Sequence, residues 1–404
     1  MEQVLYQLPE GWEWIQLGKV LDVRDGTHDS PKYVESGYPL ITSKNITGKG
    51  LDVQNVKFIS QEDFDAINKR SKVDVGDILF AMIGTIGFPT VVTDEPNYAI
   101  KNIALFKKRQ SNQNMDFFRH FLESPYAIES MLSQAKGAAQ KFVGLKVLRN
   151  FYAPLPPVLE QKRIVEKLDA VLTRIDTAIE HLQESIKLAD AFFKSILSSL
   201  VCSESIEHEK LSLEELGSFS GGGTPSKNKS EFWNGEILWI TPKDMKSPVI
   251  TNSELKITQE GVRGSSAKFI PPRSVLIVAR SGILRHTLPV CINENECTVN
   301  QDIKVFIPNE KISSEYVQHM LKGYESFILS ELVKGGVTVE SLKYNDFQNF
   351  KFSIPSIEEQ KRIVEQLSQV RKLTDPLKEE LCIKIKYLQQ LKASILDSAF
   401  KGEL

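Results

Sequence analysis

Apolar residues recur at every third or fourth position along two long stretches of the chain. The first stretch starts at Ile164 and includes Val171, and the second starts at Ile363 and includes Leu377. This spacing predicts two amphipathic helices of about 40 residues, each about 60 Å long. Because a small globule cannot cover so long a helix, we expect the two helices to pair antiparallel as a coiled coil. The alternative is that the apolar side of each helix packs only on its own domain.

Short runs of strand-forming residues precede each of these stretches. The clearest are "DILFAMI" (77–83) and "SVLIVA" (274–279), and turns rich in Gly, Pro and Asn separate such runs. The pattern predicts two globules of about 150 residues that mix strands and helices. Asp375 and Pro376 interrupt the second helical stretch, so we expect a break or bend there that the first helix lacks.

The chain repeats itself. The string "EQKRIVE" occurs at 160–166 and again at 359–365, so Gln360 lies 199 positions after Gln161. Three further pairs of strings have the same offset: "ITSK" from Ile41 with "ITPK" from Ile240, "LGKV" from Leu17 with "LGSF" from Leu216, and "SIL" from Ser195 with "SIL" from Ser394. A unit of about 200 residues, a globule followed by a helix, is therefore present twice.

We predict an α+β fold in which two repeated globules are separated by two long antiparallel helices that form a coiled coil with pseudo-two-fold symmetry. The expected parts are a first globule at 1–157, a first long helix at 158–202, a linker at 203–210, a second globule at 211–356 and a second long helix at 357–404. Two related globules held at a fixed distance suit the two half-sites of a DNA duplex. Because the anchors match while the loops between them differ, the two globules would read different sequences.

Composition and charge narrow the function. The 404 residues carry a net charge of −2, so indiscriminate coating of nucleic acid is not expected and any DNA contact must use local patches. The sequence has no signal peptide and no apolar run long enough to span a membrane, which points to the cytoplasm. The four cysteines lie in no C-x-x-C spacing, so we expect reduced thiols and no metal site.

The sequence lacks the common catalytic motifs. The chain has no G-x-x-x-x-G-K-[ST], no H-E-x-x-H, no G-x-S-x-G and no convincing dinucleotide fingerprint. The Asn/Asp-Pro-Pro-Tyr/Phe string of amino-methyltransferases is absent as well. We therefore expect no catalytic site and no cofactor, and any catalysis would come from partners. The alternatives are a two-domain ligand-binding scaffold on a coiled-coil spacer and an enzyme with an unrecognised site.

Three strings carry a resemblance to a known family. They are "DGTHDSPKY" (25–33), "GGGTPSKNKSEFWNGEILWITPKDM" (221–245) and both copies of "EQKRIVE". The chain resembles the specificity subunit of Type I restriction-modification systems. The resemblance implies two target recognition domains on double-stranded DNA and no catalytic site. It also implies two methyltransferase (modification) subunits and ATP-dependent restriction subunits as partners. The first helix departs from the family by lacking the "FKGEL" that ends the second.

Candidate DNA-reading residues are polar side chains that could reach base edges or phosphates. In the first globule they are Thr27, His28, Lys32, Lys44, Asn45, Lys141 and Lys146. In the second globule they are Thr224, Ser226, Lys227, Lys243, Arg280, Arg285, Lys334 and Lys343. For His28 a hydrogen-bonded structural role is the competing interpretation, and for each lysine a solvated surface charge.

Other aromatic, glycine and charged residues are expected to have roles other than reading bases. We expect Phe232, Trp233 and Trp239 to lie in the core rather than to stack on bases. Gly221–Gly223 are interpreted either as a turn or as a phosphate-binding loop. The charged sides of the helices either bind a modification subunit or are simply solvated. The candidates for that contact are Lys162, Arg163, Glu166, Lys361, Arg362 and Glu365.

Overall fold

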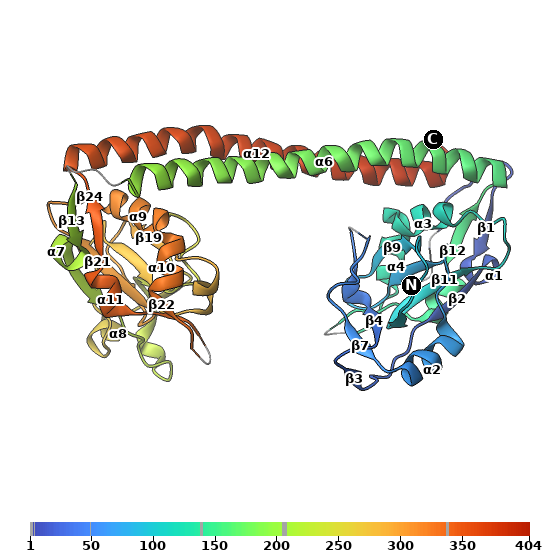
Figure 1. Cartoon of the computed structure of the whole chain (residues 1–404), viewed down its shortest axis with the longest axis horizontal. Helices are drawn as coiled ribbons and strands as arrows, with labels where there is room; N and C mark the ends of the chain where they lie inside the picture. Colours follow the sequence, from blue (N-terminus) through green and yellow to red (C-terminus); the bar gives the residue numbers. More distant parts are fainter. Residues whose placement is uncertain (1–2, 4, 49, 138–139, 204–207, 337–338) are drawn as a thin grey trace. The chain divides into compact units, whose positions relative to one another are not determined.

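The chain folds into two compact units, as seen in a computed structural model (Figure 1). The structure describes all residues except 1–2, 4, 49, 138–139, 204–207 and 337–338. The first unit comprises residues 1–183 and 382–404, and the second comprises residues 184–381. Each unit therefore contains one globule and parts of both long helices, α6 (Val158–Val201) and α12 (Ile357–Lys401).

The first globule combines short strands with short helices. Its strands are β1 (Glu13–Gln16), β2 (Leu21–Asp25), β3 (Tyr33–Val34), β4 (Tyr38–Thr42), β5 (Ile46–Thr47), β6 (Gly50–Leu51), β7 (Lys57–Ile59), β8 (Ile78–Ala81), β9 (Gly87–Val91), β10 (Ala99–Lys101), β11 (Ile103–Lys108) and β12 (Tyr152–Leu155). Its helices are α1 (Leu17–Val20), η1 (Ser43–Asn45), α2 (Gln61–Ser71), α3 (Met115–Glu123), α4 (Pro125–Ser133) and α5 (Leu145–Asn150).

The second globule repeats this plan. Its strands are β13 (Glu209–Ser212), β14 (Gly217–Gly221), β15 (Trp233–Ile240), β16 (Val249–Ile250), β17 (Leu255–Ile257), β18 (Val275–Val278), β19 (Val290–Asn293), β20 (Thr298–Val299), β21 (Ile303–Pro308), β22 (Val333–Lys334), β23 (Ser341–Leu342) and β24 (Lys351–Ile354). Its helices are α7 (Leu213–Leu216), η2 (Ser230–Phe232), α8 (Gln259–Arg263), η3 (Gly282–Arg285), α9 (Ser314–Gly323), α10 (Glu325–Glu331) and α11 (Tyr344–Asn349).

Both globules have the same sheet plan. In the first, β2, β11, β8 and β9 form an antiparallel sheet, and β4 pairs parallel with β10 in a second sheet. In the second, β14, β21, β18 and β19 are the counterparts, and β15 pairs parallel with β20. Each parallel pair contains two opposing apolar residues that are buried, Ile41 with Ile100 and Ile240 with Val299. The repeat seen in the sequence is therefore a repeat of structure.

The end of α12 lies in the core of the first globule. Phe400 is 1% exposed, and its ring lies 5.4 Å from that of Phe117 and 5.3 Å from that of Phe121, both on α3. Leu396 and Ala399 belong to the same core. The Tyr6 hydroxyl donates a hydrogen bond to the carbonyl oxygen of Phe400 at 2.8 Å.

The end of α6 completes the second globule in the same way. Leu197 and Val201 are buried in a core that also contains Tyr316 and Leu321 of α9. A Cβ atom added at Gly323, the last residue of α9, would lie 2.1 Å from Cγ2 of Val201. Since atoms cannot approach so closely, α9 needs a glycine here to admit the helix end.

The two long helices run antiparallel in each unit (Figure 1). In the first unit Arg163 donates to the carbonyl of Leu404 at 2.8 Å, and Lys392 contacts both carboxylate oxygens of Asp176 at 2.9 and 3.0 Å. In the second unit, Lys378 contacts Asp190 at 2.9 Å, and the guanidinium carbon of Arg371 lies 4.5 Å from the ring centroid of Phe193. These contacts advance along α6 while they retreat along α12, as antiparallel pairing requires.

Three expectations from the sequence need correction. The break at 375–376 does not occur, because α12 continues from Ile357 to Lys401 with Pro376 inside it. Val171 and Leu377 were expected in the apolar seam, but both are exposed, and Leu172 is buried in place of Val171. Between Leu168 and Ile175 a helix can place either Val171 or Leu172 on its apolar side, because steps of three and four residues are equally compatible with its period. Spacing alone could therefore not decide which of the two residues is buried.

The third correction concerns the string "LGKV" paired with "LGSF". Leu17 begins α1, whereas Leu216 ends α7, so the two strings do not occupy the same place. Strand pairing gives a different alignment. Val23 pairs with Phe106 in the first globule, and Phe219 pairs with Phe306 in the second, so Val23 corresponds to Phe219. The matching letters are therefore a coincidence, and the true offset in this region is three residues smaller.

The expectation for the aromatic side chains is confirmed. Phe232 and Trp239 are buried, and Trp233 packs edge-on against Trp239 with ring centroids 5.1 Å apart. The indole Nε1 of Trp239 donates to the carbonyl of Gly223 at 2.9 Å. These rings therefore belong to the core of the second globule.

Replacing Phe400 tests whether α12 completes the first globule. Phe400→Ala should lower the free energy of unfolding by about 3–5 kcal/mol, because it leaves a cavity between Phe117 and Phe121. Urea denaturation would measure the change, and Phe192→Ala, at an exposed position of α6, is the matched control. Equal effects of the two substitutions would contradict a core role for Phe400.

Candidate functional site

Each globule has a polar cleft at the end of its parallel strand pair. The first cleft, of about 700 Å³, lies where β4 and β10 end and includes Thr42, Lys44 and Lys101. The second cleft, of about 490 Å³, lies where β15 and β20 end. Because both clefts arise at the same point of a repeated fold, they are two versions of one site.

A shared turn forms one wall of both clefts. In the first, the side-chain oxygen of Asn45 accepts hydrogen bonds from the backbone amide and hydroxyl of Thr42 at 3.0 and 2.8 Å. In the second, Asp244 accepts the same two bonds from Thr241, both at 2.8 Å. This turn explains the matching strings "ITSK" and "ITPK", and it leaves Lys44 and Lys243 exposed beside the two clefts.

The other lining positions differ between the clefts. Where the first cleft has Lys101 and Asn102, the second has Asn300 and Gln301. Ile83 and Arg280 are also at equivalent positions: Ile83 forms an isolated β-bridge with Phe142, and Arg280 forms the corresponding β-bridge with Ser341. The first cleft thus has an apolar side chain where the second has a guanidinium. The scaffold is shared, while the hydrogen-bonding groups are not.

Hydrogen bonds organise the first cleft. Nδ1 of His28 lies 2.8 Å from Oδ1 of Asn102, and its Nε2 lies 2.9 Å from Oδ2 of Asp25. Asp25 also contacts Arg70. Hydrogen bonds from the side chain of Asn55 and from nearby backbone amides hold the pKa of Asp52 below its usual value. These contacts keep Asn102 and the loop at Asp52 in place.

Ion pairs organise the second cleft. Arg280 lies 4.0 Å from Asp302, and its side chain is 64% exposed, so the guanidinium is free to bind another group. Arg285 contacts Glu340, and this hydrogen bond lowers the pKa of the Glu340 carboxyl. The hydroxyl of Thr224 donates to Gln301.

The glycine run beside this cleft has a packing role. A Cβ atom at Gly222 would lie 1.9 Å from the carbonyl oxygen of Val299, so only glycine fits there. The amide of Gly223 donates to the same carbonyl at 3.0 Å. This amide is therefore engaged within the protein, which favours the turn interpretation over a phosphate-binding loop.

The clefts bring together five of the predicted DNA-reading residues. Lys44 and Asn45 line the first cleft, and Lys227, Lys243 and Arg280 line the second. The remaining candidates do not line either cleft: Thr27, His28, Lys32, Lys141, Lys146, Thr224, Ser226, Arg285, Lys334 and Lys343. Among these, His28, Thr224 and Arg285 contact side chains beside the clefts, and Lys343 donates to the carbonyl of Glu331 at 2.7 Å.

Sequence reasoning missed several lining residues. Tyr33, Lys57, Lys101, Asn102 and Gln140 line the first cleft, and Asn300 and Gln301 line the second. Lys101 is the last residue of β10, which pairs with the end of β4, and Asn102 follows it directly. That pairing joins residues about 60 positions apart, and the sequence offers no local signal for it.

The charged residues proposed for partner binding lie at the start of each long helix. Arg163 pairs with Glu160, and Arg362 pairs with Glu359, each three residues earlier and at 2.6 Å. Lys162, Glu166, Lys361 and Glu365 are exposed. Between them, Gln161 and Gln360 are buried and donate to the carbonyls of Pro156 and Pro355 at 2.9 and 3.0 Å. The repeated string thus has a structural core and a free charged surface.

In the part of the chain that the structure describes, no group of His, Cys, Asp and Glu side chains is arranged to hold a metal ion. None of the helices in that part is both long and apolar enough to cross a membrane.

Comparisons with known proteins agree with this architecture. The family model "Type I restriction modification DNA specificity domain" matches residues 9–188 and again residues 206–387. A similar relative is the EcoR124I/EcoR124II specificity subunit of Escherichia coli, which is 44% identical over 46% of this chain and 46% of its own. The MjaIX specificity subunit of Methanocaldococcus jannaschii is 32% identical over 39% of this chain and 36% of its own. The chain thus spans less than half the length of these two relatives.

A solved structure covers the whole chain. It comes from work on complex assembly and conformational transition of the type I R-M system, and it matches with a TM-score of 0.75. The match covers 99% of this chain and 100% of the other at 22% identity, a level that supports the fold. The fold and its clefts define a tandem repeat of a polar-cleft globule and a long helix. The chain belongs to the Type I restriction modification DNA specificity domain family, which is matched once in each repeat.

Asn45 should be a structural residue of the first cleft. Asn45→Ala removes an acceptor for Thr42 and a donor to the carbonyls of Asp52 and Asn55, so we expect a loss of about 1–3 kcal/mol in the free energy of unfolding. Urea denaturation measures it, and Lys44→Ala should change stability by less than about 0.5 kcal/mol. Wild-type stability of the Asn45 variant would show that its side chain is free to contact a ligand.

Proposed function

We propose that this chain is the DNA sequence-specificity subunit of a Type I restriction-modification complex. Each cleft would read one half of an asymmetric, bipartite target in double-stranded DNA. The observation that carries the proposal is the pair of clefts, which share a turn and a parallel strand pair but differ in their polar side chains. The family matched in both repeats supports it, and a scaffold without DNA is not favoured for the same reason.

The chemistry of the two clefts suits different base pairs. Arginine can donate two hydrogen bonds to guanine, and asparagine or glutamine can pair with adenine. The second cleft has Arg280 and Gln301, whereas the first has Asn102 and Gln140 with no arginine among its lining residues in the described part of the chain. The two half-sites would therefore differ in sequence.

The subunit would direct catalysis without performing it. Two modification subunits would transfer the methyl group, and ATP-dependent restriction subunits would translocate and cut the DNA, as the resemblance implies. The chain itself needs no cofactor for this role. It would act in the cytoplasm, where its DNA target lies.

The long helices offer a surface for the modification subunits. On α12, Ile383, Tyr387 and Leu391 recur every four residues in the first unit, and all are exposed, Tyr387 at 64%. In the second unit Leu373 and Leu377 are exposed on the same helix, four residues apart. Large apolar side chains on one side of a helix are typical of a helix-packing interface. We propose that each set forms the centre of a separate contact. Lys162, Arg163 and Glu166 would lie at the edge of the contact in the first unit, and Lys361, Arg362 and Glu365 at the edge of the contact in the second.

Selection of random duplexes by the assembled complex tests the DNA proposal. The bound sequences should share a split motif with a fixed gap. Arg280→Ala should relax base preference in one half-site only, at a cost of about 1–3 kcal/mol per affected base pair, because it removes one bidentate donor. Arg263→Ala, on exposed α8 and outside both clefts, is the control. Sequence-blind binding by the unaltered complex would refute the proposal.

Substitutions on α12 test the partner surface. Tyr387→Ala combined with Leu391→Ala should weaken binding of a modification subunit by at least about 2 kcal/mol, because aromatic and aliphatic anchors dominate such interfaces. Lys162→Ala, in the same unit, should cost less than about 1 kcal/mol, as expected for an edge charge. Isothermal titration calorimetry measures both. The proposed centre is wrong if the Lys162 substitution costs more than the apolar pair.

A further inference from the structure

A second pair of equivalent cavities lies where each globule meets the long helices. In the first unit the cavity is lined by β9, α3 and α6 and by Lys392 of α12. In the second unit it is lined by the segment 242–248, β19, α9 and Arg371 of α12. His120 on α3 and His319 on α9 are 199 positions apart and occupy the same place in their cavities. We call these the first and second junction cavities.

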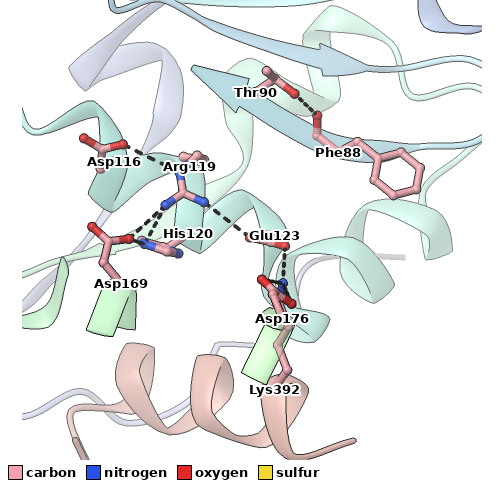
Figure 2. Close-up of polar contacts among 9 residues, drawn as sticks. All are labelled: Phe88, Thr90, Asp116, Arg119, His120, Glu123, Asp169, Asp176 and Lys392. Carbon is pink, nitrogen blue, oxygen red and sulfur yellow. Dashed lines mark hydrogen bonds and ion pairs between the residues drawn. The ribbon is translucent and has the colours of Figure 1, made fainter. Parts of the chain in front are cut away.

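The first junction cavity is lined by four carboxylates, which pair with two cations of the cavity wall. Arg119 lies 3.6 Å from Asp116, 3.6 Å from Glu123 and 3.2 Å from Asp169 (Figure 2). Lys392 lies 3.4 Å from Glu123 and 2.9 Å from Asp176. Each of these two cations therefore already has carboxylate partners. An anion entering this cavity would meet four carboxylates.

The second junction cavity has the opposite charge. Its lining includes Lys243, Lys246, Lys322 and Arg371, and none of its described lining residues carries a carboxylate. The charge differs at equivalent positions: the second cavity has Lys322 where the first has Glu123, and Arg371 where the first has Leu172. The same fold thus presents a cationic cavity in one repeat and an acidic cavity in the other.

Arg371 is the side chain in this cavity that most needs a ligand. Its Nε atom is buried and has no hydrogen-bond partner, and none of the described carboxylates forms an ion pair with it. Its guanidinium lies against the ring of Phe193, and Phe193 is the residue that corresponds to Lys392 of the first unit. A buried guanidinium nitrogen without a hydrogen-bond partner is costly, whereas a bound oxyanion would satisfy this donor and a second one in a bidentate geometry.

The surrounding groups suit a phosphoryl group. Lys322 pairs with Glu325, which lies outside the cavity lining, while Lys243 and Lys246 are exposed at the cavity. The volume, about 530 Å³, falls within the range of small-molecule sites. The cavity shares Pro242, Lys243 and Ser281 with the second cleft, whereas the first junction cavity shares no described lining residue with the first cleft.

We propose that the second junction cavity binds a phosphoryl group through Arg371, Lys246 and Lys243, and that the first junction cavity does not. The phosphoryl group has two possible sources, a free phosphate or nucleotide and the backbone of DNA that extends from the second cleft. The DNA source rests on the proposed function, but the free source does not. In either case the two repeats, which share one fold, bind anions unequally.

His319 provides a local signal for binding. Burial lowers its pKa to about 4, and the charge of Arg371 acts in the same direction, so its imidazole is neutral at pH 7. An anion bound at Arg371 would change the electrostatic environment of this ring. His120, in the acidic cavity, serves as an internal control.

The test uses the full-length protein with histidine labelled with ¹³C at Cε1. Inorganic phosphate, adenosine monophosphate and a DNA duplex are titrated at constant ionic strength against a chloride reference. We expect a saturable shift of the His319 resonance with at least one phosphoryl ligand and no shift of the His120 resonance. Response to the duplex alone assigns the DNA backbone as the source, and response to the small ligands assigns a free phosphate.

Variants identify the residues involved. Arg371→Gln should weaken the affinity on the order of tenfold or more, because a charge-assisted bidentate contact is lost. Lys246→Gln, at an exposed position that does not affect folding, should weaken it less, and Arg362→Gln, paired with Glu359 outside the cavity, should leave it unchanged. An unmoved His319 resonance, an equal shift in chloride, or unchanged affinity in both the Arg371 and Lys246 variants would overturn the proposal.

Discussion

Each long helix ends in the core of the globule that belongs to the other repeat, and the fold depends on this exchange. Phe400, from the second repeat, fills the space between Phe117 and Phe121, while Val201, from the first repeat, lies in the core around α9. Neither globule has a complete core without the other repeat's helix. A half-chain that paired with its own copy would offer Val201 in place of Phe400 and Phe193 in place of Lys392, so it would lose volume and an ion-pair partner of Asp176. The exchange explains why one chain carries both repeats.

On this shared scaffold the two repeats differ where ligands would bind. The clefts keep the turn between Thr42 and Asn45, or between Thr241 and Asp244, and change the side chains around it. The junction cavities keep a histidine and reverse the charge around it. Differences confined to lining positions leave the cores intact, so the specificity of each half can change without cost to the fold.

The sequence predicted the architecture better than the site, and the reason is physical. The string "EQKRIVE" could be recognised because it combines a buried glutamine, Gln161 or Gln360, with an isoleucine in the core, and both globules need this arrangement at the start of their helix. The coincidence of "LGKV" with "LGSF" shows the limit of matching letters, since the ladders place these strings three residues apart. The clefts could be predicted only in part: Lys44 lies in a repeated string, but Asn102 reaches the same cleft through strand pairing between distant segments. The surroundings of Arg371 could not be predicted, because they come from three distant segments, 242–248, 281–291 and 318–322.

The central claim is that two clefts on one scaffold read two different half-sites. It is tested most directly by placing four lining residues of the second cleft, Arg280, Asn300, Gln301 and Val339, at the equivalent positions of the first cleft. The substitutions are Ile83→Arg, Lys101→Asn, Asn102→Gln and Gln140→Val, and the bases methylated by the assembled complex are then mapped. The account predicts that the half-site of the first unit changes toward that of the second, while the other half-site and the gap stay the same. An unchanged target, in a variant that folds and assembles normally, would contradict it.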